Sequence, residues 1–156
     1  FATMHAICWE RYSMKVVLEK IEVQTRRDKE LIDITPQVER VVRESGIREG
    51  MVNVLTMHTS SGLLVTEGLP CLERDIINHL EALAPDDGDY YHNRYLDIDG
   101  RLGFHAGAHL KSVLGGFQVF FPIHEGAIVK GSRQRIYFAE YDGPLCRTYC
   151  VQVLGE

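Results

Sequence analysis

Runs of β-branched and aromatic residues, separated by polar turns, are the feature that most limits the folds open to this chain. Valine and isoleucine are abundant at residues 15–25, and apolar and polar side chains alternate at 117–123, 135–141 and 145–154. Both patterns predict strands. Asp142-Gly143-Pro144 predicts a turn between the last two. Strands that follow one another this closely predict antiparallel hairpins rather than alternating βαβ units.

Three stretches carry helical signals. Thr35 followed by Pro36 predicts the start of a helix with Thr35 as its cap, and Gly46 predicts its end. Leucine and isoleucine recur on one face over residues 72–83. The third helix is expected from about residue 106 to 114.

Two short strands, at 51–57 and 63–65, and a long polar loop at 84–103 complete the expected elements. Together they predict an α+β fold in which a mixed, largely antiparallel β-sheet packs with a few helices. The chain has 156 residues, of which 45% are hydrophobic and 25% charged. A chain of this length buries roughly 70% of its unfolded surface as one domain.

Charge and cysteine content exclude several classes of protein. The net charge is −5 and the only tight basic run is Arg26-Arg27, which argues against nucleic-acid binding. No apolar stretch approaches the ~20 residues needed to cross a bilayer, and the N-terminus lacks the pattern of a signal peptide. We therefore expect no membrane partner and a cytoplasmic location. The four cysteines form no Cys-x-x-Cys pair, so neither a zinc ribbon nor a redox motif is expected.

A histidine followed by hydroxyl side chains is the first candidate for a functional site. His58 opens Thr59-Ser60-Ser61-Gly62 directly after an apolar run. A loop of this kind brings metal-binding or proton-transfer chemistry together with hydrogen-bonding hydroxyls. The alternative is ordinary turn chemistry beside a structural histidine.

Further histidines follow in the second half of the chain. His105 and His109 have the i, i+4 spacing that places two imidazoles on one face of a helix, and His92 lies in the preceding loop. Three imidazoles from separate segments would suit zinc and leave one coordination position open. The alternative, histidines without a common centre, stays open at this level.

The order and spacing of these motifs resemble the YjbQ family, also called uncharacterised protein family 0047. The resemblance runs from about residue 16 to 156 and includes His58-Thr59-Ser60-Ser61-Gly62, Glu67, Tyr90-Tyr91-His92, the segment from Ala108 to Gly115, Gly131-Ser132-Arg133-Gln134 and Asp142-Gly143-Pro144. It implies a small α+β domain, a homotrimer, and thiamine-phosphate synthase activity of the kind that some members show. It also places the single domain at 14–156 and leaves 1–13 as an N-terminal extension or an expression remnant.

Three departures from the family pattern bear on the chemistry. This chain reads His105-Ala106-Gly107-Ala108-His109 where many members read Asn-Ala-Asp-Ala-His, which removes a carboxylate and adds an imidazole. It reads Thr66-Glu67-Gly68 in place of Asn-Glu-Asn, and Ser132-Arg133 in place of Thr-Trp. Because magnesium prefers oxygen ligands, the first change weakens an acidic magnesium site, and the set of histidines favours zinc with magnesium as the alternative. The last change makes a pocket wall cationic.

These observations predict a metal-assisted enzyme of the YjbQ type that acts on a small phosphorylated molecule, by hydrolysis or with thiamine-phosphate synthase as a side activity. The expected metal ligands are His58, His92 and His109, with His105 as a fourth ligand or a catalytic neighbour and Glu67 as general acid or base. The expected phosphate donors are Ser60, Ser61, Lys111, Arg133 and Gln134. For Lys111 an ordinary solvated position is the alternative. For the whole protein the alternative is a trimeric small-molecule-binding or regulatory protein without turnover.

Overall fold

The computed structural model describes residues 13–94 and 105–156. Most of the expected N-terminal extension and the second half of the long loop at 84–103 lie outside this part of the chain. The described elements confirm the α+β class and the dominance of antiparallel pairing.

Two antiparallel sheets form the centre of the fold. The larger has the strand order β1-β8-β3-β5-β6, with bounds Lys15–Gln24, Cys146–Gly155, Gly50–Thr56, Gln118–His124 and Ala127–Ile128. The smaller has the order β2-β7-β4, with bounds Glu30–Asp33, Gln134–Glu140 and Ser61–Glu67. The pairing of β1 with β8 places the first described strand beside the last strand of the chain.

The inner faces of the two sheets share one apolar core. Val52 and Val151 of the larger sheet and Phe138 of the smaller are fully buried in it. The rings of Phe138 and Tyr149 lie with centroids 5.9 Å apart and join the two sheets directly. Helix α1 (Thr35–Ser45) adds its buried valines to this core. Alternation along the strands explains the arrangement, because every second side chain points to the same face.

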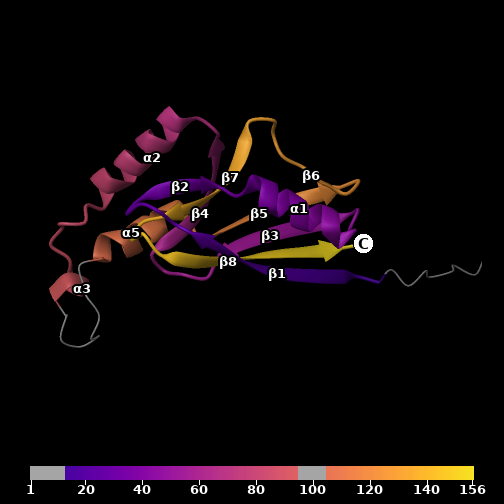
Figure 1. Cartoon of the computed structure of the whole chain (residues 1–156), viewed down its shortest axis with the longest axis horizontal. Coiled ribbons are helices and arrows are strands. Elements are labelled where there is room, and N and C mark those ends of the chain that lie inside the picture. The colour runs from indigo at the N-terminus through magenta and orange to yellow at the C-terminus, as the bar shows by residue number, and fades with distance from the viewer. Residues whose placement is uncertain (1–12, 95–104) are drawn as a thin grey trace, which may run out of the picture.

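The other face of the smaller sheet is covered by helices. Leu80 of α2 (Pro70–Leu83) and Ala108 of α5 (Ala106–Gly115) pack on Ala139 of β7 and on Tyr141 just after it. The short helix α3 (Tyr91–Arg94) lies near them. In Figure 1, α2, α3 and α5 gather at one end of the molecule, whereas α1 and β6 lie towards the other. The fold therefore has three layers: the larger sheet, the smaller sheet, and the helices that cover the smaller sheet.

The outer face of the larger sheet has no covering layer among the described residues. Val16 and Leu18 of β1 are each 57% exposed, and Phe120 of β5 is 67% exposed. Met51 of β3 lies on the same face, opposite Leu154 of β8. This apolar outer sheet face contrasts with the buried inner face of the same strands.

Several local expectations are corrected. Thr35 is not the cap of α1: Ile34 occupies the cap position, and the Thr35 hydroxyl instead accepts a hydrogen bond from the backbone N–H of Ile136 at 2.8 Å. Gly46 ends the helix as expected, with a positive φ of 70° that glycine adopts without strain. Strands β2 and β6 were not predicted, because segments of four and two residues are too short to show a period.

The described part of the chain contains three cysteines, and none of them forms a disulfide bond. Cys71, Cys146 and Cys150 are free thiols. Among the helices of the described ranges, none is both long and apolar enough to pass through a bilayer.

Candidate metal centre

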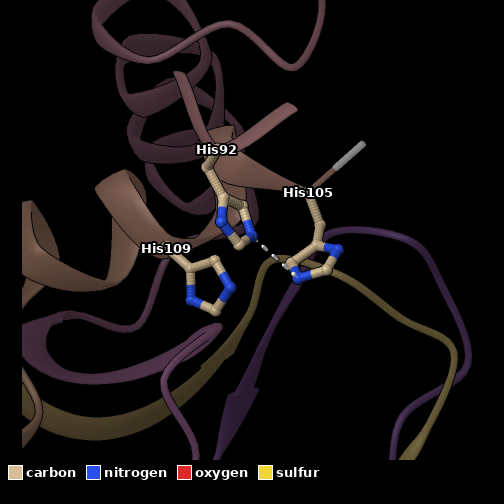
Figure 2. Close-up of side chains that lie close together, drawn as sticks. All are labelled: His92, His105 and His109. Carbon is tan, nitrogen blue, oxygen red and sulfur yellow. Dashed lines mark hydrogen bonds between the residues drawn. The ribbon is translucent and has the colours of Figure 1, made fainter. Parts of the chain in front are cut away.

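Three imidazoles come together where α3 meets the start of α5. His92, His105 and His109 each offer a ring nitrogen, and these three nitrogens lie within 4.8 Å of one another. The centroids of their rings are 4.8–5.3 Å apart. Figure 2 shows the rings facing a common space, with the Nε2 atoms of His92 and His105 at 3.5 Å. Nitrogens bound to one tetrahedral zinc ion at about 2.1 Å lie roughly 3.4 Å apart, so this group fits such an ion with only small ring rotations.

Local structure explains how the trio is assembled. His105 occupies the N-cap position of α5 and His109 follows one turn later, so both rings lie on the same side of the helix. The Nδ1 atom of His109 lies 2.9 Å from the carbonyl oxygen of Thr59. Because a carbonyl only accepts, Nδ1 carries the proton and Nε2 presents its lone pair. A backbone carbonyl that orients a ligand histidine in this way is typical of metal sites.

A pocket of about 570 Å³ opens beside the trio. His92 and His109 lie on its wall, and the rest of its lining comes from Thr59, Tyr90, Tyr91, Ala106 and Leu110. None of these lining residues carries a formal charge at neutral pH when the histidines are neutral. The pocket therefore suits an apolar or aromatic group next to the imidazoles.

His58 lies apart from this group, which corrects the expected ligand set. Its Nε2 atom accepts a hydrogen bond from the backbone N–H of Thr148 at 2.8 Å, so the lone pair needed by a metal is already used. Burial, followed by the nearby Arg147 guanidinium, lowers the pKa of His58 below its ordinary value. His105 takes the place in the trio that the sequence assigned to His58.

The His58 contact predicts a pH dependence of stability. Because the pKa of His58 is lower in the folded state than the ordinary 6.5, folding favours the neutral ring, and the free energy of unfolding should fall as pH drops below 6.5. His58→Gln keeps an acceptor for Thr148 but cannot titrate. Urea unfolding between pH 8 and 5 should therefore show a flatter profile for this variant. An unchanged slope in folded His58→Gln would contradict this prediction.

The two serines of the His58 motif are buried and have protein partners. Ser60 Oγ accepts a hydrogen bond from Arg147 at 3.1 Å. Ser61 Oγ pairs with the Thr56 hydroxyl at 2.6 Å, and its carbonyl accepts from Ser112. The Ser60 hydroxyl contacts β8, and the Ser61 hydroxyl and carbonyl join β4 to β3 and α5. Neither hydroxyl opens towards a ligand, which corrects their expected role as phosphate donors.

Lys111 is also buried rather than placed to meet a phosphate. Its side chain is 1% exposed, and its ammonium lies 2.6 Å from Asp86 and 2.8 Å from Glu81. Burial alone would raise the pKa of Asp86, but hydrogen bonds from Lys111 and Lys29 outweigh it and hold that pKa below its ordinary value. Neither the expected phosphate contact nor the alternative of a solvated position describes this lysine.

The remaining predicted residues gather elsewhere. Glu67 ends β4 and forms an ion pair with Arg133 at 2.9 Å. Gln134 accepts a hydrogen bond from the backbone N–H of Gly131 at 2.7 Å. A strand rises ~3.3 Å per residue, so Glu67 lies about 20 Å from Ser61 along β4. Ser61 is near the trio, because it follows Thr59 by two residues and the Thr59 carbonyl contacts His109. Within one chain, Glu67 and Arg133 are therefore separated from the trio.

Three residues important to this region were missed. Glu140 and Arg147 form a buried ion pair that supports Ser60, and Asp86 binds Lys111. Their partners lie in other segments, so periodicity along the chain contained no signal for them. The acidic turn Asp86-Asp87 was visible, but nothing in its composition distinguished the residue that turns inwards.

Comparisons with known proteins agree with this fold. The family model described as UPF0047 protein YjbQ-like matches residues 19–156. A UPF0047 protein from Methanothermobacter thermautotrophicus is 38% identical over 143 residues, covering 92% of this chain and 95% of that protein. Another from Archaeoglobus fulgidus is 39% identical over 135 residues, covering 86% and 99% of the two chains.

Solved structures extend the comparison to three dimensions. A crystal structure of a YbjQ-like protein of unknown function from Sulfolobus solfataricus superposes with a TM-score of 0.85 at 35% identity, covering 92% of this chain and all of that one. An uncharacterised conserved protein of the YjbQ/UPF0047 family from Clostridium acetobutylicum gives a TM-score of 0.78 at 34% identity, covering 86% and 98%. The match in both sequence and structure spans nearly the whole chain, and the chain therefore belongs to the YjbQ-like UPF0047 family.

Proposed function

We propose that this protein is a metal-dependent enzyme whose divalent ion, zinc in preference to magnesium, is held by His92, His105 and His109. The observation that carries the proposal is the convergence of three ring nitrogens within 4.8 Å. The Thr59 carbonyl supports it, because it sets the tautomer in which Nε2 of His109 is free to coordinate.

The donor set favours hydrolysis over synthesis from a diphosphate. Three imidazoles suit zinc and leave a fourth position open, whereas magnesium prefers carboxylate and phosphate oxygens. Zinc, when bound, supplies a Lewis acid and lowers the pKa of coordinated water to about 7. The protein's own contribution is to orient the rings and to hold the substrate beside them.

We infer that the substrate is a small phosphorylated molecule with an apolar body. The charged end would lie at the metal, because Ser60, Ser61 and Lys111 have protein partners and are buried. The body would lie in the adjoining pocket against Tyr90 and Leu110. Aryl phosphates have this combination and are suitable probes.

A binding or regulatory protein without turnover is the second candidate function. The position of Glu67 favours it, because this expected general acid or base forms an ion pair with Arg133 at the far end of β4. In that case the same metal and pocket would retain a phosphorylated metabolite without consuming it.

We further propose that the chain forms a homotrimer through the apolar outer sheet face. Support comes from the outer face of one sheet, where Val16 of β1, Leu154 of β8 and Met51 of β3 lie side by side and Phe120 is exposed on the next strand, β5. A contiguous apolar face of this kind is typical of an interaction surface. The side-chain oxygen of Asn53 on the same face is buried without a hydrogen-bond partner among the described residues, and a second copy would supply one.

Metal analysis of the full chain, purified without a histidine tag or added metal, tests the proposed function. We expect close to one zinc ion per chain in the wild type and loss of the metal in His105→Ala and His109→Ala. His58→Ala and His124→Ala remove an imidazole outside the trio and should keep the metal. A wild type without metal, or equal metal in His105→Ala, contradicts the proposal.

The zinc-loaded protein separates the two candidate functions when it is incubated with p-nitrophenyl phosphate. Release of p-nitrophenol that is lost in His109→Ala supports the enzyme. Saturable binding of the intact ester without release supports the binding protein.

A further inference from the structure

The trio depends on two segments that the described chain does not connect directly. His92 lies on α3, whereas His105 and His109 lie at the start of α5, and residues 95–104 between them are outside the described part. Among the described residues, contacts outside the trio hold the segment that carries His92 against α5. The region just before α3 provides one such contact through Asp86.

Lys111 joins that region to α5 from inside the protein. It follows His109 by two residues, and its ammonium lies 2.6 Å from Asp86 Oδ1. The same ammonium lies 2.8 Å from Glu81 of α2, so one buried cation joins α5, α2 and the segment that leads to His92. Charge-assisted contacts in a buried environment are short and directional, and they resist sliding of the segments.

Close packing at Gly107 supports the same arrangement. A Cβ atom added to Gly107 would lie 2.8 Å from Asp86 Oδ1 and 3.1 Å from the Ala84 carbonyl. The segment at 84–86 therefore packs against the backbone of the first turn of α5, between the two histidines of that helix. At the N-terminus of α5, the side chain of Asn93 accepts a hydrogen bond from the backbone N–H of Ala106 at 3.2 Å.

We propose that Lys111 is a positioning residue for the metal centre, which through Asp86 sets the spacing of His92 relative to His105 and His109. This role rests on the proposed function, because it concerns the same three ligands. Lys111 touches neither the ion nor the substrate. It acts by holding the loop before α3 against α5, so that the three ring nitrogens stay within reach of one ion.

The test uses cobalt(II) as the probe, because its visible absorption reports coordination geometry. In Lys111→Met the buried ammonium is replaced by an apolar chain of similar length, and we expect cobalt affinity to fall by about 10–100-fold, the range seen when groups that orient metal ligands are removed. The ligand-field bands should also change in intensity. Lys29→Met is the matched control, because Lys29 contacts Asp86 from the turn before β2 and not from α5. Its cobalt spectrum should match the wild type.

Gly107→Ala keeps every charge but pushes the Asp86 segment away from α5. It therefore tests the positioning role if Lys111→Met does not fold. It should weaken cobalt binding in the same direction. Wild-type affinity and spectrum in folded Lys111→Met, or in Gly107→Ala when Lys111→Met is unfolded, would overturn the positioning role alone. A wild type that binds no cobalt would overturn the proposed metal centre and the positioning role with it.

Discussion

Replacement of Arg147 by methionine is expected to lower the free energy of unfolding by about 3–5 kcal/mol, the range for a buried ion pair that loses one partner. Glu140 and Arg147 lie between the two sheets with side chains 0% and 7% exposed, joined by hydrogen bonds of 2.6 and 2.7 Å. Without the guanidinium, the Glu140 carboxylate stays buried with only neutral donors around it. Urea unfolding at pH 7 measures the loss.

A double-mutant cycle separates this pair from ordinary packing. In Arg147→Met/Glu140→Gln both charges are removed, and the amide oxygen of glutamine can still accept from the backbone N–H groups of Tyr141 and Asp142. We expect the double variant to be less destabilised than the sum of the two single variants. Additive losses would show that the two charges do not stabilise one another.

Replacement of Phe120 by aspartate is expected to reduce the mass of the protein in solution to one third of the wild-type value. Phe120 is 67% exposed on the apolar outer sheet face, where β5 pairs with β3. A carboxylate there would have to lose its water on association, which is strongly unfavourable without a partner charge. Sedimentation equilibrium, or size-exclusion chromatography with light scattering, measures the change.

The matched control changes another exposed apolar residue on a different surface. Val113 of α5 is 80% exposed, and Val113→Asp should leave the mass of the wild type unchanged. If Phe120→Asp keeps the wild-type mass while folded, or if the wild type itself is a monomer, the proposed interface is wrong.

The sequence was a good guide wherever local physics decides the structure. The strand at the start of the domain and the helix stop at Gly46 follow from β-branched residues and from a glycine that tolerates positive φ. The i, i+4 spacing of His105 and His109 likewise follows from helix geometry alone. These features need no knowledge of the rest of the fold.

The candidate site was predicted less completely, because its membership depends on which loops meet. His58 has the more suggestive sequence context, yet its ring nitrogen accepts from the Thr148 backbone, and His105 joins His92 and His109 instead. Glu67 and Arg133 form an ion pair with each other. Glu67 lies about 20 Å along β4 from Ser61, which is the end of the strand near the trio. Only the direction in which the strand runs reveals this separation.

The sequence by itself determined the α+β class, most of the strands, and the presence of histidines at helical spacing, because propensity and periodicity act over a few neighbouring residues. It did not determine which strands pair: β7 and β8, on the two sides of the predicted turn at Asp142-Gly143-Pro144, lie in different sheets rather than in one hairpin. Only the tertiary structure decided that Lys111 is buried between Asp86 and Glu81 and that Glu140 pairs with Arg147. The reason is physical. Whether a charged side chain is solvated or buried depends on partners from distant segments, and those partners meet only when the sheets and helices have packed.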